Sequence, residues 1–355
     1  MKETNDFTYV VTADDSSAGY DIKSIIRREF HFSSRLMGKI KRNHCVYLNG
    51  QSVPGWITPK PDDTITVVMP EEKSNFPPQD IPISVVYEDE DMLVIDKQPG
   101  YIVHPTASHP EDTIANGIAK YCIDTNQTFK LRFVNRLDRD TSGLLVIGKN
   151  SHCQNQISQQ MKTDKVEKIY TALVHGIIDE EEGTIDLPIG RPDEIGIKRK
   201  VMPNGAPCVT HYKVLKRFFP KKNSISNPLD RSSLDMEQHK KYLQYKDEFL
   251  KAHPDKQKLY EYLAAHDEAN DVVHEPGFTL LSLKLETGRT HQIRVHVSYI
   301  GHPIVGDTLY GGASDIISRQ ALHASQLSLN QPVTGKRLSF EAPLPEDISK
   351  ALEQI

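Results

Sequence analysis

The chain opens with two short stretches in which apolar residues recur every three to four positions. These are residues 24–30 (SIIRREF) and 33–42 (SSRLMGKIKR), and the spacing is that of amphipathic helices. Ser33 or Ser34 can cap the second helix, because a serine oxygen accepts a hydrogen bond from a free first-turn N–H. The pattern therefore predicts two helices close to the N-terminus.

After these helices the apolar pattern changes from helical spacing to the alternation of a strand. CVYLNGQSV alternates around Asn49-Gly50, a pair that tolerates the positive φ angles of a two-residue hairpin turn. DDTITVVMP predicts one more strand. Together with the two helices, these strands predict a small N-terminal α/β domain over residues 8–70.

The next stretch, residues 71–82 (EEKSNFPPQDIP), is polar and rich in proline, which fixes φ and donates no backbone hydrogen bond. It predicts a linker. Beyond it, strand patterns occur in ISVVYE, MLVID, LLVIGKN, KIYTALVHG, HYKVLKRF and FTLLSLKLETG, with one helix pattern in SHCQNQISQQMKT. Because strands and helices do not alternate regularly, we predict an α+β domain over residues 83–350 with a mixed, largely antiparallel sheet.

Residues 218–276 interrupt this second domain. The segment is dense in charges of both signs, and Tyr242, Tyr245 and Phe249 stand at helical spacing. It lies between two predicted strands, so we expect a charged helical insertion at the end of a hairpin. A solvated appendage explains the segment better than a chemical role does.

Composition narrows the class of protein. Among 355 residues, 37% are apolar, and no run reaches the roughly 18 apolar residues of a membrane-spanning helix. The N-terminus shows no signal-peptide pattern. The four cysteines are far apart and form no Cys-x-x-Cys motif, which argues against a zinc site and a disulfide framework. We therefore expect a cytoplasmic protein with no membrane association.

The net charge of −5 disfavours a nucleic-acid partner, but charge is distributed unevenly. Residues 21–45 carry seven basic and two acidic side chains. On charge alone, a solvated helical face and an RNA-binding face explain this stretch equally well. The helix pair, the VYLNGQSV hairpin and the PDDTITV strand resemble an S-four-like RNA-binding domain, and this resemblance favours RNA. The candidate RNA-binding residues are Arg27, Arg28, Arg35, Lys39 and Arg42.

Several common catalytic devices are missing from the sequence. It contains no phosphate-binding Gly-x-x-x-x-Gly-Lys-Ser/Thr loop and no Gly-x-Ser-x-Gly elbow. HQIRVH reads as a strand, on which His291 and His296 would face opposite sides, and this argues against a shared metal ion. His104 and His109 have no matching cluster of ligands. We expect no metal and no cofactor.

Two arginine-rich stretches remain as candidates for chemistry. In VNRLDRDTSG, Asp138 stands between Arg136 and Arg139 and precedes an apolar strand. In ETGRTHQIRVH, Arg294 stands between two apolar residues, and a partly buried guanidinium needs an anionic partner. Structural ion pairs are common, so before any resemblance is considered they explain such residues better than a catalytic site does.

The chain resembles the RluA family of pseudouridine synthases. NRLDRDTSGLLVIGKN is similar to the family signature, and five other stretches match in the family's order: EDEDMLVIDKQPGYIVHP, KIYTALVHG, LPIGRP, ETGRTHQIRVHVSYIGHPIVGDTLYG and LHASQLSL. Except for the insertion, the resemblance covers residues 83–345. Asn135 departs from the pattern, because the family usually has histidine there. We expect this change to cost some local hydrogen bonding but not function.

The resemblance implies an enzyme that isomerises uridine to pseudouridine in RNA. Asp138 would be the essential ionised carboxylate, with Arg294 as its cationic partner. Arg136 would occupy the place that the extruded uridine leaves. Tyr170 would face the flipped uracil, although a core tyrosine on a strand explains it too. Leu322 would form an apolar wall or part of the core, and Arg289 would contact the substrate. Asp140 and Thr141 read as turn-forming residues.

Alternatives stay open at this point. Large-subunit ribosomal RNA is the expected substrate and transfer RNA the main competitor. A noncatalytic RNA-binding factor on an old enzyme scaffold is a second reading, against which the retained Asp138, Tyr170 and Arg294 argue. A nucleoside or glycoside hydrolase is a third, but it would be expected to use two paired acids. We expect a monomer.

Overall fold

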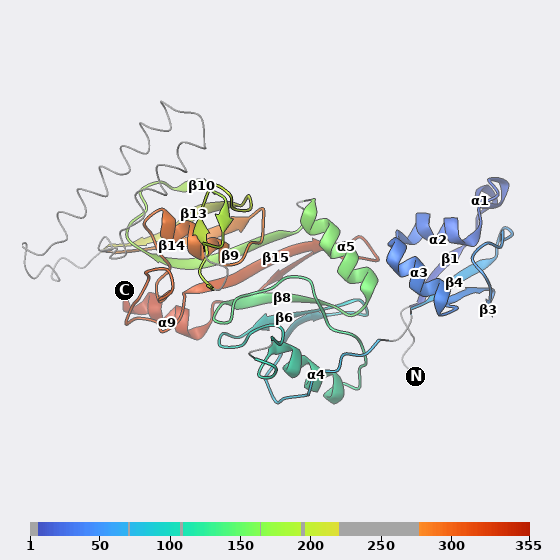
Figure 1. The fold of residues 1–355 in the computed structure, drawn as a ribbon, viewed down its shortest axis with the longest axis horizontal. Helices are drawn as coiled ribbons and strands as arrows, with labels where there is room; N and C mark the ends of the chain where they lie inside the picture. The colour runs from blue at the N-terminus through green and yellow to red at the C-terminus, as the bar shows by residue number, and fades with distance from the viewer. Residues whose placement is uncertain (1–5, 70–71, 107–108, 164, 193–195, 220–276) are drawn as a thin grey trace, which may run out of the picture. The chain divides into compact units, whose positions relative to one another are not determined.

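A computed structural model describes residues 6–69, 72–106, 109–163, 165–192, 196–219 and 277–355 (Figure 1). The chain divides into two compact units. The first comprises residues 1–139, 144–166 and 328–340, and the second comprises residues 140–143, 167–327 and 341–355. Among the described residues, no helix is long and apolar enough to span a membrane.

The first unit begins with a four-stranded antiparallel sheet and the helices that cover it. The strand order is β1-β4-β2-β3. The bounds are β1 Asp6–Val10, α1 Ala13–Ser17, α2 Ile22–Phe30, α3 Ser34–Arg42, β2 Val46–Leu48, β3 Gln51–Ser52 and β4 Thr64–Val68. Both predicted helices are confirmed, and Ser33 caps α3 by accepting a hydrogen bond from the Leu36 N–H. The hairpin is confirmed as well, with positive φ at Asn49 and Gly50. The patterns did not reveal β1 or α1.

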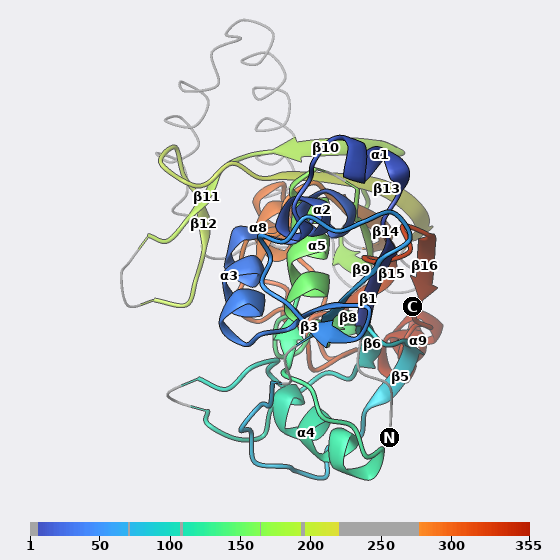
Figure 2. The ribbon, with the colours of Figure 1, turned by 90° about the vertical axis from the view of Figure 1, so that its right-hand side faces the viewer.

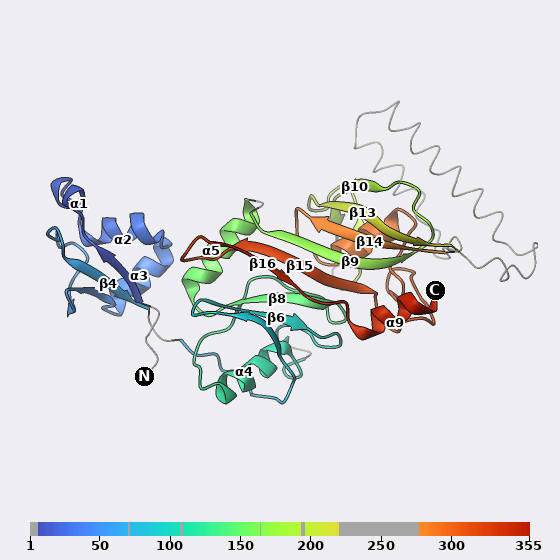
Figure 3. The ribbon, with the colours of Figure 1, turned by 180° about the vertical axis from the view of Figure 1, so that it is seen from behind.

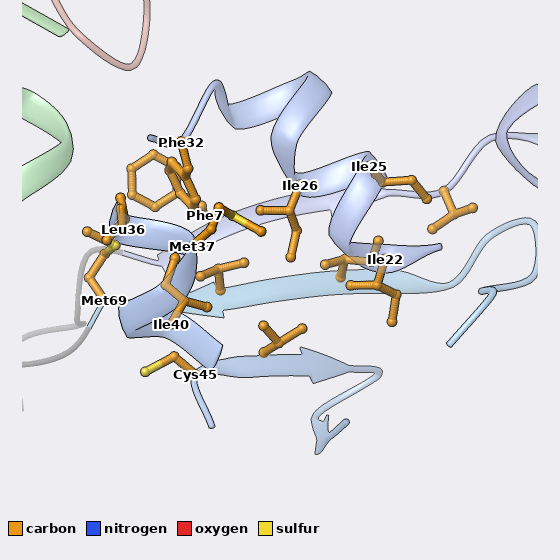
Figure 4. Close-up of a cluster of buried hydrophobic side chains, with 14 residues drawn as sticks. Phe7, Ile22, Ile25, Ile26, Phe32, Leu36, Met37, Ile40, Cys45 and Met69 are labelled. Atoms are coloured by element: carbon orange, nitrogen blue, oxygen red, sulfur yellow. The ribbon is translucent and has the colours of Figure 1, made fainter. Parts of the chain in front are cut away.

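A separate apolar core lies between these helices and the sheet (Figure 4). Ile22, Ile25 and Ile26 of α2 point onto the strands, and α3 contributes three further side chains. These positions recur at helical spacing, so burying one stripe leaves the cations of both helices on the outside.

The rest of the first unit surrounds a second core. Its elements are β5 Ser84–Glu88, β6 Met92–Lys97, α4 Ile114–Asp124, β7 Arg132–Phe133, β8 Ser142–Gly148, α5 Ser151–Lys162 and β16 Arg337–Glu341. β5 pairs antiparallel with β6, and β7 with β8. Side chains of β6, α4 and β8 form the core. The sequence patterns missed α4, which a Thr113–Asn116 capping box starts.

The second unit is built on a sheet in which β13, β14 and β9 lie side by side (Figure 3). Its elements are β9 Glu167–His175, β10 Glu182–Asp186, β11 Ile189–Gly190, β12 Lys200–Val201, β13 Val209–Phe218, β14 Phe278–Leu285, α8 Gln292–Tyr299, β15 Leu322–Asn330 and α9 Glu346–Gln354. The order β10-β13-β14-β9-β15 is followed by the start of β8, which pairs with β15 in parallel. This mixture confirms the predicted α+β class with a largely antiparallel sheet. β11 and β12 form a small separate pair (Figure 2).

One predicted strand is wrong. HQIRVH starts α8, with His291 as its N-cap in the left-handed conformation, φ 57°. The prediction failed because the apolar and polar residues of QIRVHV alternate as in a strand. Arg294 and His296 of this helix are both buried, and each has a polar partner outside the helix, Asp307 and Thr210 respectively.

The predicted insertion and the predicted linker are each described by the structure only in part. Residues 220–276 of the predicted insertion lie outside them. The strands that flank it are antiparallel neighbours, with Phe218 opposite Phe278. Within the predicted linker, residues 72–82 contain no helix or strand. The domain boundaries themselves stay predictions.

Gly143 is essential where β8 meets β15. Its φ is +110°, and an added Cβ would lie 2.3 Å from the carbonyl oxygen of Ala324. We expect Gly143→Ala to lower the free energy of unfolding by about 2–5 kcal/mol, because it adds both an overlap and a disfavoured φ. Urea unfolding measures this change. Gly288→Ala is the control in the same unit, since its new Cβ would meet only the Lys168 Nζ at 3.7 Å. Equal stability of both variants would contradict the expectation.

Candidate active site

The loop that carries Asp138 belongs to the first unit and begins beside β8. The Val134 N–H donates to the Val146 carbonyl at 2.9 Å. Asp138 is half-buried, whereas Arg136 and Arg139 are exposed. The loop is thus anchored at its start, and Asp138 lies near the surface of the unit.

Asn135 continues this anchoring with its side chain. The amide nitrogen donates to the Leu144 carbonyl at 3.1 Å, and the amide oxygen accepts from the Val146 N–H at 2.8 Å. The amide thus donates and accepts a main-chain bond at once, as a neighbouring strand would. The expected loss of local hydrogen bonding relative to histidine stays a prediction.

The far side of the Asp138 loop is held by the KQPG segment. Lys97 is fully buried, and its ammonium donates to the carbonyls of Gln98 at 2.8 Å and Arg139 at 2.9 Å. The Gly100 N–H also donates to the Arg139 carbonyl, at 3.0 Å, and the Arg139 Nε donates to the Gly100 carbonyl at 3.0 Å. Asp138 therefore lies between two fixed residues, Asn135 and Arg139. The Arg139 side chain is engaged with Gly100.

Directly after Arg139 the chain enters the second unit, where Arg319 holds it. Arg319 Nη1 donates to the Asp140 carbonyl at 3.0 Å, and the guanidinium forms a bidentate pair with Asp347. Ser142 Oγ lies 3.0 Å from Nδ1 of the buried His323. The predicted role of Asp140 and Thr141 in holding a turn agrees with this arrangement, because residues 139–140 form a turn and Thr141 Oγ1 accepts from Gln320.

Within the second unit, Arg294 has a carboxylate partner that the sequence analysis did not name. Its Nε and Nη2 donate to the two oxygens of Asp307 at 2.7 and 2.8 Å. The side chains are 8% and 1% exposed. The Arg294 guanidinium also lies over the Tyr310 ring, 5.0 Å from its centroid. A buried bidentate pair fixes the guanidinium, since leaving either charge alone would be costly.

The start of α8 is held in place by neutral polar groups. Gln292 accepts from the Thr287 hydroxyl and the Arg289 N–H, and it donates to the Val209 carbonyl. His296 is buried against the Thr210 hydroxyl and the Leu187 carbonyl, and burial lowers its pKa. The described residues contain no group of three potential ligands that could hold a metal ion.

The other predicted substrate residues also fall in the second unit. Tyr170 on β9 and Leu322 on β15 are buried, at 8% and 4% exposure. Their strands are neighbours, as the hydrogen bond from Thr171 Oγ1 to Ser325 Oγ at 3.1 Å shows (Figure 3). Arg289 is exposed.

Within the described residues, some of the N-terminal cations are paired with acidic side chains and others are not. Arg28 pairs with Asp15 at 2.5 Å and with Glu29, and Lys39 pairs with Glu72 at 2.8 Å. Asp15 is buried, and a backbone hydrogen bond from Thr12 is the largest cause of its lowered pKa. Arg27, Arg35 and Arg42 are exposed and make no ion pair within the described residues. These three are the better candidates for binding a phosphate.

The cysteines offer no reactive thiolate. Burial is the largest cause of a raised pKa at Cys45, Cys122, Cys153 and Cys208, and it raises the pKa of Cys122 to about 11. A thiol with a raised pKa is protonated at neutral pH and is a poor nucleophile. The four thiols are therefore poor candidates for covalent chemistry.

Sequence reasoning missed Lys97, Asp307, Tyr310 and Arg319. All but Arg319 lie inside stretches that carry the family resemblance, IDKQPG and GDTLYG. The need of Arg294 for an anion could have directed attention to Asp307. Nothing in the sequence around Arg319 marks it.

Comparisons with known proteins show the family of the chain. A profile of the family described as RNA pseudouridylate synthase matches residues 91–299. The chain is 36% identical over 329 residues to an uncharacterized RNA pseudouridine synthase of Bacillus subtilis, YjbO, covering 92% of this chain and 96% of that protein.

A second relative is ribosomal large subunit pseudouridine synthase D of Pseudomonas aeruginosa, 34% identical over 331 residues, with 89% of this chain and 85% of that protein covered. Among solved structures, human RNA pseudouridylate synthase domain containing 1 aligns with 75% of this chain and 85% of its own, at 24% identity and a TM-score of 0.49.

Proposed function

Because the chain belongs to the RNA pseudouridylate synthase family, we propose that it isomerises specific uridines in large-subunit ribosomal RNA, with Asp138 as its essential carboxylate. In this reaction the bond between N1 and C1′ breaks, the uracil turns, C5 bonds to C1′, the C5 proton is released, and N1 takes up a proton. No atom is gained or lost overall. The chain is thus an isomerase, and its RNA substrate and the roles of its residues are what we propose.

The anchoring of the Asp138 loop is the observation that supports this role most directly. Asn135 and Arg139 are both fixed by hydrogen bonds, and the carboxylate between them is half-buried. An ionised carboxylate held in this way can attack an electrophilic carbon or accept a proton, whereas a neutral acid can do neither well. The family resemblance makes Arg294 the cationic partner of Asp138, in addition to its bond with Asp307.

The uridine would be extruded from folded RNA, because a stacked base is out of reach, at a cost of a few kcal/mol. Arg136, which is exposed and follows the anchored Asn135, would occupy the vacated position, since a guanidinium both stacks and binds phosphate. Tyr170 and Leu322, on neighbouring strands, would line the uracil. Arg289 would bind the RNA backbone. A site that encloses the detached uracil would prevent its escape during rotation.

A hydrolase is a poorer explanation of the same residues. It would need a second carboxylic acid beside the first. The buried acid near Arg294 is Asp307, and both of its oxygens are bound by that arginine. Because the Arg294 guanidinium occupies both oxygens, Asp307 presents neither of them to a leaving group.

Large-subunit ribosomal RNA is proposed as the substrate because one relative is named for it, at 34% identity. This substrate implies a cytoplasmic enzyme. Mapping pseudouridines in ribosomal and transfer RNA from a strain that lacks the protein tests the proposal. We expect one or more sites to disappear from large-subunit RNA and to return when the gene is restored. Loss of sites from transfer RNA alone would contradict it. The monomeric state stays a prediction.

The N-terminal cations would bind RNA phosphates. We expect changing Arg27 and Arg35 together to Ala to weaken RNA binding and to reduce the slope of log affinity against log salt by about 0.7–0.9 for each phosphate that is no longer neutralised. Fluorescence anisotropy of labelled ribosomal RNA fragments at several salt concentrations measures both. The control removes two exposed cations elsewhere, Lys336 and Lys350. Equal effects of the two double variants would show that α2 and α3 are not part of the RNA-binding surface.

A further inference from the structure

The chain has a single tryptophan, Trp56, and its side chain is 72% exposed. It belongs to the N-terminal part of the first unit, between β3 and β4. An indole is the largest side chain and gains the most from contact with another surface. An exposed apolar residue is ordinary by itself, so its surroundings decide what Trp56 can do.

The backbone on both sides of Trp56 is fixed to the first turn of α2. The Lys23 N–H donates to the Gly55 carbonyl at 2.9 Å, and the Ile22 N–H donates to the Ile57 carbonyl at 2.9 Å. Ile57 also packs against the N-terminal core. Trp56 is therefore displayed from a rigid turn at the end of a helix, which lowers the entropy lost when its ring makes a contact.

Two free cations lie on the helix that this turn contacts. Lys23 and Arg27 are one helical turn apart on α2, and both are exposed. Neither makes an ion pair within the described part of the chain. The adjacent Arg28 differs, because Asp15 and Glu29 neutralise it and it lies 5.2 Å from the Tyr20 ring centroid.

The exposed sequence neighbours of Trp56 are mostly polar. Ser52, Thr58 and Lys60 are polar, Pro54 is apolar, and Ile57 is half-buried. The centre of a protein–protein interface is depleted of charge and rich in apolar contacts. An aromatic ring beside cations is instead the combination that binds unpaired nucleotides, where the ring stacks on a base and the cations track the backbone.

We propose that Trp56 stacks on an unpaired base of the RNA substrate, while Lys23 and Arg27 bind the flanking phosphates. The inference rests on the proposed RNA-binding role of the N-terminal part and adds the kind of RNA that it selects. A stem–loop or single-stranded segment would be preferred over a continuous duplex, because paired bases are already stacked on one another.

The single tryptophan allows a direct test with the full-length protein. Its fluorescence is followed while a stem–loop RNA with an unpaired loop is added, and a blunt duplex of equal length is the comparison. We expect the stem–loop to quench the fluorescence at the same concentrations at which anisotropy reports binding, and the duplex to quench it much less. Trp56→Ala should weaken stem–loop binding about 5- to 150-fold, the effect of losing one base–aromatic stack. Val10→Ala, which truncates a 55% exposed apolar residue on β1, should bind as the wild type does.

Binding without quenching, or equal affinities of wild type and Trp56→Ala, would overturn the inference, and so would absence of binding to either RNA. Quenching by ribosomal proteins instead of RNA would assign the ring to a protein partner and would overturn it too. Pseudouridine formation by the wild type without quenching would leave the proposed function standing. Quenching without pseudouridine formation would support the role of Trp56 and count against the proposed substrate.

Discussion

Asp138→Asn should abolish pseudouridine formation while RNA binding stays near the wild-type level. The substitution keeps the size of the side chain and removes its negative charge, so the loop that Asn135, Lys97 and Gly100 anchor should keep its conformation. An amide is neither a nucleophile nor a base at neutral pH. We expect the single-turnover rate to fall by about 10³-fold or more, as happens when a residue that takes part in bond making is removed.

Asp140→Asn is the matched control for this variant. Asp140 follows in the same loop, and Arg319 contacts its main-chain carbonyl, which the substitution retains. We expect its rate to stay within a few-fold of the wild type. Appreciable turnover by Asp138→Asn, or an equal loss in both variants, would remove Asp138 from the mechanism.

Asp307→Asn should cause a large loss of stability. It removes the carboxylate that binds Nε and Nη2 of the buried Arg294 guanidinium, and breaking such a buried pair costs about 3–5 kcal/mol. Arg294 should also lose its fixed position, so pseudouridine formation should fall in the fraction that remains folded. Urea unfolding measures the first effect, and a rate measured well below the unfolding midpoint measures the second.

A second arginine–aspartate pair allows the effect of burial on stability to be measured apart from the effect of pairing. Arg319 and Asp347 form the same bidentate contact, but the Asp347 side chain is 40% exposed. Arg319 also keeps its bonds to main-chain carbonyls when Asp347 is changed. We expect Asp347→Asn to cost about 1 kcal/mol or less, since solvent screens exposed pairs. Equal losses for the two variants would show that burial of the Arg294–Asp307 pair is not what makes it strong.

The sequence predicted elements best where a local pattern coincided with the packing. The α2–α3 pair and the Asn49-Gly50 hairpin follow from periodicity and turn chemistry, which act within a few residues. The helix α8 was misread because both its apolar and its polar side chains are buried, so no solvent-facing stripe marks a helical period. α4 was missed although its capping box could have been seen in the sequence.

For the site, the sequence predicted which types of residue take part better than it predicted their contacts. The need of Arg294 for an anion was predictable, but its bond to Asp307 depends on how two segments of the second unit fold together. The fully buried ammonium of Lys97 could not be foreseen, because its partners are carbonyls that every residue carries. Asn135 was expected to make fewer local hydrogen bonds than the histidine usual in the family. Only the structure shows the two main-chain bonds that Asn135 makes.

The most direct test of the mechanism is the fate of the label when the purified protein acts on ribosomal RNA with tritium at C5 of its uridines. Isomerisation through Asp138 with the uracil held in place predicts that tritium enters water in step with pseudouridine and that no free uracil appears. Release of free uracil, or no tritium release from any ribosomal RNA that the protein binds, would contradict it.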